Sequence, residues 1–444
     1  MPCANMIAAE AAPNRFFAVD PVFSSRTYIE EWGDPANPPV ILVHGLGDNG
    51  ARDWRYLAPA LAENFYVVAF DLPGFGRSEK YNALYTPDTY TSVVQWIADT
   101  YVDGRFTLIG HSMGGAIALN YAAGHADRLM RLVLIDAAGI LHRTAFTKHL
   151  INNVKLPGAN NSLPADNLQA LNALLGINLE DIDRYPAAMD VVLLSPMVRG
   201  MVLGGDSRKI AGFALVQHDF SGKLRRVTVP TLVIWGAEDP VTPLRTGRLL
   251  ASNLPMARLE IIQGAGHTPM IESTTRLNRL VLAELNSSVD RYSAEPAEQI
   301  YSETADSVAC RGEDSRYISG RYALVTIENC DRVLIENSRI ERLIVRNSSV
   351  EILTSVIGGG DIAVEVENSV LMATATTFTA VTPVVLSGSR LDFAGVEIIA
   401  GEKPFEADAR STVLFSVSTV RTPEYSKQAH GVFYLSHEQH PFQR

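Results

Sequence analysis

Cysteine, long apolar runs and stretches of one charge sign are all scarce in this sequence. The three cysteines, Cys3, Cys310 and Cys330, are too few for a disulfide scaffold and lack the clustered spacing of a zinc site. The sequence leaves open whether Cys310 and Cys330 form a single disulfide bridge. We therefore expect neither a small disulfide-rich fold nor a bound metal or cofactor.

No apolar run approaches the roughly 20 residues that a membrane helix needs, so we expect no membrane span and a soluble chain. The formal net charge of -11 comes from 38 basic and 49 acidic residues that form no long run of one sign. This balance argues against nucleic acid or an anionic membrane as the main partner and favours a neutral substrate. The length of 444 residues exceeds the size at which one core usually stops growing, which predicts two domains.

The N-terminal residues 1–14 are small, polar and rich in alanine, and we expect them to form a flexible tail. They have neither the basic segment nor the apolar stretch of a signal peptide. We expect a periplasmic or secreted protein from which the export signal has been removed. A cytoplasmic location is the alternative.

Residues 15–285 alternate short β-branched runs with longer amphipathic stretches, which is typical of a doubly wound, mostly parallel sheet with crossover helices. Each expected strand is followed by a glycine, aspartate or proline, at the edge where such sheets carry their chemistry. The expected strands are 40–43, 66–70, 106–109, 132–135, 231–235 and 259–262.

Residues 140–226 interrupt this alternation with apolar patches of helical character. The patches are 168–175, 189–194 and 201–203. An insertion of this size over the strand ends predicts a helical cap, and ordinary additional helices are the alternative.

The composition becomes polar and acidic after residue 285, which predicts a linker over residues 286–320. Residues 332–341 (RVLIENSRIE) are then matched, position by position, by residues 342–351 (RLIVRNSSVE). Looser copies follow about twenty residues apart. Alternating apolar residues that end in Asn-Ser or Gly-Ser turns suit short strands stacked on one another.

We therefore expect residues 321–425 to form an all-β domain, a small parallel β-helix with its own core, followed by a tail at 426–444. A β-sandwich would also show short strands with turn signals but not the ten-residue register, and it is the alternative. The open end of a β-helix would favour assembly into a homo-oligomer or docking to a partner. Polysaccharide binding is the competing role.

Residues 110–114 (GHSMG) follow an expected strand and open an expected helix, as a G-x-S-x-G nucleophile elbow does. The turn is too tight for side chains on its flanks, and it leaves the Ser112 oxygen projecting above the sheet. A serine hydroxyl needs a neighbouring base, and that base needs an orienting carboxylate. Asp239 and His267 each follow an expected strand, in the chain order serine, acid, histidine. We predict Ser112, Asp239 and His267 as a catalytic triad.

Two other carboxylates compete for the acid position. Asp136 also follows an expected strand at the correct edge of the sheet, and Glu238 is adjacent to Asp239 but would point the other way. Asp136 is the main substitute for Asp239.

Negative charge on an attacked carbonyl oxygen must be met by preset backbone donors. The loop at residues 44–47 (HGLG) offers the Leu46 amide, and the helix after the elbow offers the Met113 amide. We predict these two amides as the oxyanion hole. We expect His44 to be structural, tying its loop by a hydrogen bond.

Residues 15–285 resemble the α/β-hydrolase family, in the branch with esterases, lipases and carbon–carbon bond hydrolases. The resemblance rests on five motifs in family order: HGLG at 44–47, DLPGFGRS at 71–78, GHSMGG at 110–115, GAED at 236–239 and GAGH at 264–267. Because Ser112 holds the nucleophile position, the resemblance does not extend to the relatives that attack through a carboxylate. The C-terminal repeat departs from the usual single-domain member.

The expected function is hydrolysis of a carboxylic ester through an acyl-Ser112 intermediate, as in carboxylesterases and lipases. A carbon–carbon bond hydrolase of a diketone or dienoate substrate is the alternative, with Arg143, Arg199 or Arg208 holding a substrate carboxylate. A hypothesis from another functional class is that the protein is not catalytic and acts in binding or assembly through the β-helix.

Overall fold

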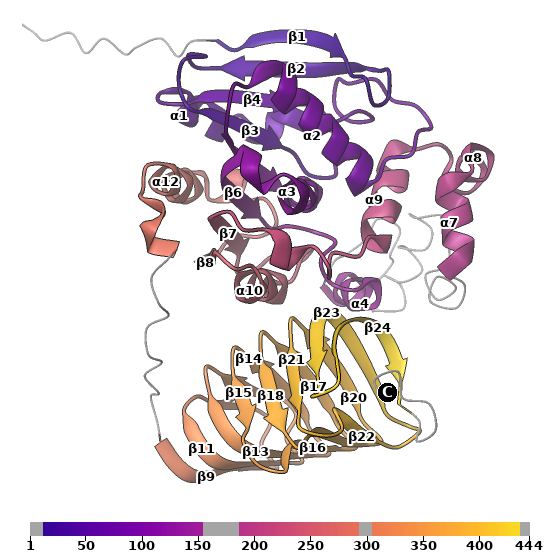
Figure 1. The fold of residues 1–444 in the computed structure, drawn as a ribbon, viewed down its shortest axis with the longest axis vertical. Coiled ribbons are helices and arrows are strands. Elements are labelled where there is room, and N and C mark those ends of the chain that lie inside the picture. The colour runs from indigo at the N-terminus through magenta and orange to yellow at the C-terminus, as the bar shows by residue number, and fades with distance from the viewer. Residues whose placement is uncertain (1–11, 154–185, 293–303, 436–444) are drawn as a thin grey trace, which may run out of the picture.

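A computed structural model describes residues 12–153, 186–292 and 304–435, which form an N-terminal and a C-terminal domain (Figure 1). The N-terminal domain is built on an eight-stranded sheet with helices on both faces. The C-terminal domain is all β and holds a large, almost entirely parallel sheet. The predicted succession of an α/β domain and an all-β domain is therefore confirmed.

The N-terminal sheet has the strand order β1-β2-β4-β3-β5-β6-β7-β8. From β4 to β8 all neighbours are parallel, whereas β2 is antiparallel to both β1 and β4. The six predicted strands correspond to β3–β8. The bounds are β1 (Asn14–Val19), β2 (Arg26–Trp32), β3 (Pro39–Val43), β4 (Tyr66–Phe70), β5 (Phe106–His111), β6 (Leu129–Ile135), β7 (Thr231–Gly236) and β8 (Ala257–Ile262).

Alternate side chains of each central strand enter two separate cores, because successive residues of a strand point to opposite faces. In β3, for example, Ile41 packs with one core and Val40 with the other. The first core lies under α2, α3 and α10, and the second lies under α1 and α12. The bounds of these helices are α1 (Leu57–Ala62), α2 (Pro87–Tyr101), α3 (Met113–Gly124), α10 (Leu244–Asn253) and α12 (Thr274–Leu285).

Helices connect β6 to β7 in the region predicted as a cap. They are α4 (Arg143–Asn153), α7 (Pro186–Leu194), α8 (Pro196–Leu203) and α9 (Ser207–Gln217). Two of the predicted helical patches fall in α7 and α8, and the patch at 168–175 lies outside the described residues. The start of α9 is tied to the loop that follows β4, because the Ser207 hydroxyl donates a hydrogen bond to the Gly74 carbonyl.

The C-terminal β structure begins earlier and ends later than the sequence predicts. β9 and β10 lie inside the range expected as a linker, and β24 lies inside the range expected as a tail. Few of their side chains are buried, so the sequence lacks a strong apolar signal there. Backbone pairing of β9 with β11, of β10 with β12 and of β24 with β23 makes them strands. The bounds are β9 (Thr304–Arg311), β10 (Arg316–Ile318), β11 (Arg321–Glu328), β12 (Val333–Glu336), β13 (Arg339–Arg346), β14 (Ser349–Leu353), β15 (Val356–Gly358), β16 (Ile362–Glu367), β17 (Val370–Thr374), β18 (Thr377–Ala380), β19 (Thr382–Ser387), β20 (Arg390–Ala394), β21 (Glu397–Ala400), β22 (Phe405–Ala407), β23 (Thr412–Arg421) and β24 (Ser426–Tyr434).

The Asn-Ser turns of the repeat have a defined structural role. Asn347 has φ 47°, a left-handed conformation that asparagine tolerates better than most residues. The following Ser348 is buried, and its hydroxyl donates to the Arg346 carbonyl at 2.7 Å while accepting from the Cys330 amide at 2.9 Å. The Ser348 amide in turn donates to the hydroxyl of Ser369, which follows Asn368 in a copy of the same turn. Each serine thus satisfies buried backbone groups of neighbouring turns.

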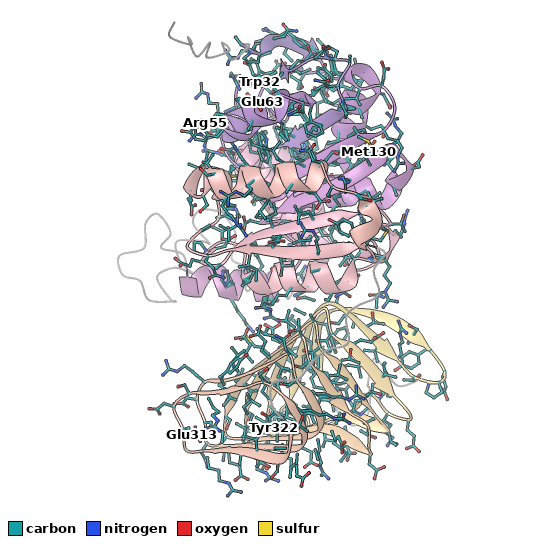
Figure 2. All side chains as sticks on the ribbon, turned by 90° about the vertical axis from the view of Figure 1, so that its left-hand side faces the viewer. Trp32, Arg55, Glu63, Met130, Glu313 and Tyr322 are labelled. Carbon is teal, nitrogen blue, oxygen red and sulfur yellow. A yellow bond between two sulfur atoms is a disulfide. The ribbon has the colours of Figure 1, made fainter. Side chains whose placement is uncertain are left out.

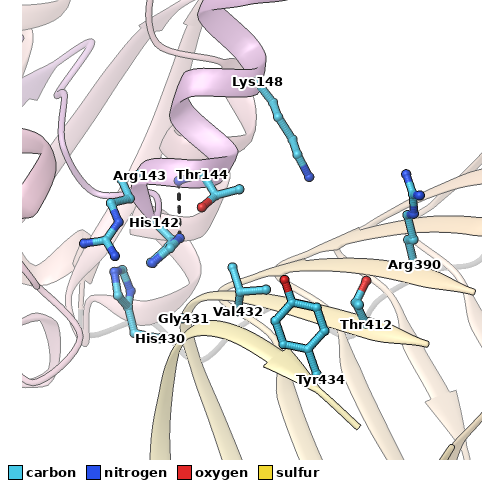
Figure 3. A pocket seen from close by; sticks show the side chains of 10 residues that line it. All are labelled: His142, Arg143, Thr144, Lys148, Arg390, Thr412, His430, Gly431, Val432 and Tyr434. Carbon is cyan, nitrogen blue, oxygen red and sulfur yellow. Dashed lines mark hydrogen bonds between the residues drawn. The ribbon is translucent and has the colours of Figure 1, made fainter. Parts of the chain in front are cut away.

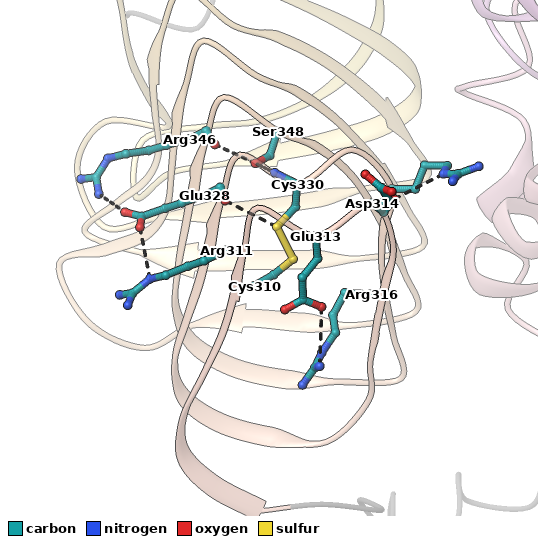
Figure 4. The surroundings of a disulfide bond; sticks show 10 residues. Cys310, Arg311, Glu313, Asp314, Arg316, Glu328, Cys330, Arg346 and Ser348 are labelled. Carbon is teal, nitrogen blue, oxygen red and sulfur yellow. Dashed lines mark hydrogen bonds and ion pairs between the residues drawn. A yellow bond between two sulfur atoms is a disulfide. The ribbon is translucent and has the colours of Figure 1, made fainter.

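The C-terminal domain has a core of its own, in which Tyr322 is buried (Figure 2). A disulfide joins Cys310 of β9 to Cys330, which follows β11 (Figure 4). The structure thus contains the disulfide bridge that the sequence left as one possibility.

The two domains also share part of one core. Ala394, Leu414 and Val417 of the C-terminal domain pack with the N-terminal core that contains Leu249 and Leu250 of α10. The sequence predicts a separate core for each domain, and the structure adds this shared patch because α10 lies directly on the β sheet. Polar contacts accompany it, among them a hydrogen bond from the His142 amide to the Ser416 hydroxyl.

Candidate active site

Ser112 occupies a sharp turn between β5 and α3. Its φ of 53° and ψ of -118° lie outside the φ/ψ regions that residues other than glycine favour, so the backbone is strained there. The surrounding sheet holds the strain, because the Ser112 amide donates to the Ile135 carbonyl and its carbonyl accepts from the Ala138 amide, both at 3.0 Å. The hydroxyl is thereby presented at the C-terminal edge of the sheet, as the sequence predicts.

The glycines around the elbow are required by close backbone approach. A Cβ atom on Gly110 would lie 2.2 Å from the Gly114 carbonyl oxygen, and one on Gly114 would lie 2.1 Å from the Val43 carbonyl oxygen. Gly45 is restricted less severely, since its Cβ would lie 2.9 Å from His111 Nδ1 and 3.0 Å from Ser112 Cβ. The three glycines allow β3, β5 and α3 to converge at the serine.

The structure brings Ser112, His267 and Asp239 together in a chain of hydrogen bonds. The Ser112 hydroxyl donates to His267 Nε2 at 3.0 Å, and His267 Nδ1 donates to Asp239 Oδ2 at 2.8 Å. Asp239 also accepts hydrogen bonds from the Thr242 amide and hydroxyl. Although burial opposes ionisation, the hydrogen bonds from His267 and Thr242 hold the pKa of Asp239 below its usual value.

The other two candidate acids have different surroundings. Asp136 is fully buried and accepts a hydrogen bond from the Gly236 amide, and burial together with the charge of Asp239 raises its pKa well above the usual value. This environment disfavours the charged form of Asp136, which makes it a poorer partner for an imidazolium than Asp239. Glu238 is exposed.

The residues predicted as oxyanion donors come from two elements, the loop after β3 and the start of α3. Met113 is the first residue of α3, where backbone amides have no partner within the helix. Leu46 follows Gly45 in the loop after β3, and its side chain reaches α9, where a Cβ on Gly212 would lie 3.4 Å from it. The cap region thus contacts the loop that carries the predicted Leu46 donor.

His44 ties this loop down, as the sequence predicts. Its Nδ1 donates to the Gly45 carbonyl at 2.7 Å, and its Nε2 accepts from the Leu72 amide at 2.9 Å. Burial lowers the pKa of His44, so the ring is neutral and can make both bonds.

Two polar residues of the site were missed by the sequence analysis. Thr242, which holds Asp239, stands three residues after it, and this spacing is a common local capping pattern that could have indicated the contact. His111 Nε2 donates to the His267 carbonyl at 2.7 Å, and burial lowers the pKa of His111 to about 3, so it stays neutral. A histidine next to a nucleophile gives no local signal for such a long-range contact.

The three arginines considered for a substrate carboxylate are engaged in different ways. Arg199 is buried and donates to Asn82 Oδ1 and to the Leu193 carbonyl. Arg208 pairs with Asp48 and Asp206. Arg143 donates to Gln217 and lines a crevice between the two domains.

Within the described residues no three potential metal ligands gather, and no helix of this part of the chain has the length and apolar character to cross a membrane.

Residues 38–274, more than half of the chain, match the sequence model of the alpha/beta hydrolase fold family. The chain therefore belongs to the α/β-hydrolase fold family and is an enzyme. The strand order and the strained serine turn described above agree with this assignment.

Similar proteins include several hydrolases. The 2-hydroxy-6-oxononadienedioate/2-hydroxy-6-oxononatrienedioate hydrolase of Klebsiella pneumoniae is 26% identical over 280 residues, which cover 62% of this chain and 96% of that protein. An uncharacterised protein of Mycobacterium tuberculosis is 26% identical over 275 residues, covering 55% of this chain and 74% of that protein. Among solved structures, the enol-lactonase of Burkholderia xenovorans is similar with a TM-score of 0.45 and 24% identity, covering 61% of this chain and all of that chain.

Proposed function

We propose that this enzyme hydrolyses a carboxylic ester of a neutral or apolar substrate through an acyl-enzyme intermediate on Ser112. The observation that carries the proposal is the continuous hydrogen-bond chain from the Ser112 hydroxyl through His267 to Asp239. The net charge of -11 favours a neutral substrate, because an acidic protein repels anions at long range.

The reaction proceeds in two halves. His267 Nε2 accepts the Ser112 proton while the serine oxygen attacks the ester carbonyl, and the Leu46 and Met113 amides bind the resulting oxyanion. The protonated His267, stabilised by Asp239, then gives the proton to the departing alcohol, which leaves an acyl-serine. A water molecule, deprotonated by His267, then attacks the acyl carbon, and the protonated His267 returns the proton to the Ser112 oxygen as the carbon–oxygen bond breaks and the carboxylic acid leaves.

The test is reaction of the purified protein with a fluorophosphonate and with p-nitrophenyl esters of increasing acyl length. We expect labelling and turnover in the parent, and loss of both in Ser112→Ala. Ser92→Ala, which changes an exposed serine of α2, serves as the matched control and should retain both. A parent protein that is not labelled would support the alternative in which the C-terminal domain supplies a binding function.

A second candidate is hydrolysis of a carbon–carbon bond in a diketone or dienoate. The similarity to a dienedioate hydrolase and to the 2-hydroxy-6-oxo-6-(2'-aminophenyl)hexa-2,4-dienoic acid hydrolase of Metapseudomonas resinovorans, at 29% identity over 261 residues, favours it. The pairing of Arg208 with two aspartates and of Arg199 with Asn82 argues against a free carboxylate clamp at those positions. The test compares kcat/KM for such a dienoate with kcat/KM for the p-nitrophenyl esters. A value for the dienoate well above that for every ester would support carbon–carbon bond hydrolysis.

For the C-terminal domain we propose a parallel β-helix, folded separately from a catalytic domain at residues 15–285. Its support is the spacing of paired strands: Val333 lies opposite Val350, Val350 opposite Leu371, and Leu371 opposite Leu391. Partners thus lie 17 to 21 residues apart, or two of the ten-residue units, as successive turns of a coil would. An experimental structure would test this proposal, and three strands in each turn would support it.

A further inference from the structure

A crevice of about 680 Å³ lies between the two domains (Figure 3). One wall is the start of α4 with the residue before it, and the other wall comes from β20, β23 and β24. Neither Ser112 nor His267 lines the crevice, so it is distinct from the candidate active site. Its volume falls in the range that holds small organic ligands in other proteins.

The crevice is cationic in a protein that is acidic overall. None of the described residues that line it is an aspartate or glutamate, whereas three of them are lysine or arginine. Figure 3 shows Lys148 reaching from α4 and Arg390 from β20 into the space between the domains. Within the described parts of the chain, neither of these two side chains is in an ion pair, although several other arginines of the C-terminal domain are, including Arg342 and Arg346.

The floor of the crevice offers a hydroxyl-bearing and partly apolar surface. The Thr412 and Tyr434 hydroxyl groups point toward the same space as Arg390, beside the Val432 side chain (Figure 3). Tyr434 is 73% exposed, so its ring is available to a ligand. An exposed aromatic ring next to two cations suits a molecule with an apolar or sugar-like body and a charged group.

We propose that this crevice binds a small organic anion whose phosphate or carboxylate group lies between Lys148 and Arg390, with its body against Tyr434. Oxyanions are the ligands that guanidinium and ammonium groups bind best, because the hydrogen bonds are charge-assisted. Each domain supplies one of the two cations, so the site is complete only when the domains are docked. Such a site gives the fused C-terminal domain a function that the catalytic triad does not require.

The test uses isothermal titration of the full chain with two pairs of probes. Glucose 6-phosphate is compared with glucose, and galacturonate with galactose, so that each pair differs in the charged group on a similar ring. We expect at least one charged probe to bind with a Kd below about 1 mM and its neutral counterpart to bind at least tenfold more weakly. The phosphate pair and the carboxylate pair distinguish the two forms of the anion.

Variants of the two cations locate the binding. We expect Lys148→Gln and Arg390→Gln each to weaken binding about tenfold or more, since a hydrogen bond to a charged group is lost. Arg339→Gln, which changes an exposed arginine of β13 that does not line the crevice, should leave the Kd unchanged. Binding should also persist in Ser112→Ala, which separates this site from the proposed ester hydrolysis.

The proposal is overturned by any of three results. It is wrong if neither charged probe binds. It is also wrong if the neutral sugars bind as tightly as the charged ones, or if the Lys148 and Arg390 variants bind like the parent.

Discussion

Arg245 Nη2 donates a hydrogen bond to Asp392 Oδ1 at 3.0 Å and so joins the first turn of α10 to β20. The Arg245 Nε also reaches the Thr374 hydroxyl at 3.2 Å, and the Arg245 side chain is only 11% exposed. Arg245 stands three residues after Thr242, which holds Asp239. The contact between the domains therefore lies close in the chain to the acid of the candidate triad.

We expect the Arg245–Asp392 contact to stabilise the docked domains. Asp392→Asn or Arg245→Gln should each lower the free energy of unfolding by about 1–3 kcal/mol, because a largely buried charge loses its partner. Urea unfolding of both single variants and the double variant gives the coupling energy between the two residues. As a control, Arg342→Gln removes a half-exposed ion pair with Glu365 and should cost less than about 1 kcal/mol. Additive single effects would show that the contact contributes nothing of its own.

Removal of the C-terminal domain should leave the triad able to act. A chain that ends near Asp290 retains every residue of the triad, and the C-terminal domain has a separate core. We expect a smaller, active protein with kcat within about tenfold of the parent. Its melting temperature should fall, because Ala394, Leu414 and Val417 no longer pack against the N-terminal core. An insoluble or inactive product, judged by ester turnover and by size in solution, would mean that the C-terminal domain completes the catalytic core.

The two buried aspartates Asp136 and Asp239 should respond differently to amidation. Asp239→Asn should lower kcat by about 10⁴-fold, because the amide no longer orients and stabilises the imidazolium. Asp136→Asn should change kcat less than about tenfold, since burial disfavours the charged form of Asp136 and an amide oxygen can still accept the Gly236 hydrogen bond. Steady-state kinetics with a p-nitrophenyl ester distinguishes the two. A larger loss in Asp136→Asn would assign the acid to that residue.

Two glycines of α3 provide a matched pair. Gly114→Ala places a Cβ 2.1 Å from the Val43 carbonyl oxygen, so we expect the elbow to distort and activity to fall at least about 100-fold. Gly124→Ala, at the other end of the same helix, meets no atom within 4 Å and should be neutral or stabilise by up to about 1 kcal/mol. Ester turnover and thermal unfolding of both variants test this, and equal behaviour would contradict the role of the close approach.

Activity should rise with pH between about 5 and 8, since only a neutral imidazole can accept the serine proton. The other groups of the site keep their charge over this range. The lowered pKa of Asp239 keeps it ionised, and the pKa of about 3 keeps His111 neutral. We therefore expect kcat/KM to rise because the triad base must be unprotonated, with no contribution from Asp239 or His111. A flat profile would contradict this unless substrate encounter limits the rate, which added viscosogen would reveal.

Much of the catalytic half could be predicted because its signals are local. Buried strands such as Val40 to Val43 are continuous apolar runs, and the residues after them meet at one edge of a parallel sheet. Chain order and the glycine-flanked turn were then enough to predict Ser112, Asp239 and His267 together. The edge strand β1 was not predicted, because its apolar run at 16–19 (FFAV) shows no alternation of inner and outer residues, and the structure leaves Phe17 and Val19 exposed.

The sequence by itself determined the α/β sheet, the elbow and the stacked repeat, because each depends on neighbouring residues. Only the tertiary structure decided which aspartate reaches His267, because Asp136 and Asp239 follow adjacent strands and differ in burial and hydrogen bonding. The docking of α10 on the β domain was likewise beyond any local pattern. Arg245 and Asp392 are 147 residues apart, and their contact exists only because both domains fold and present complementary charges at the same place.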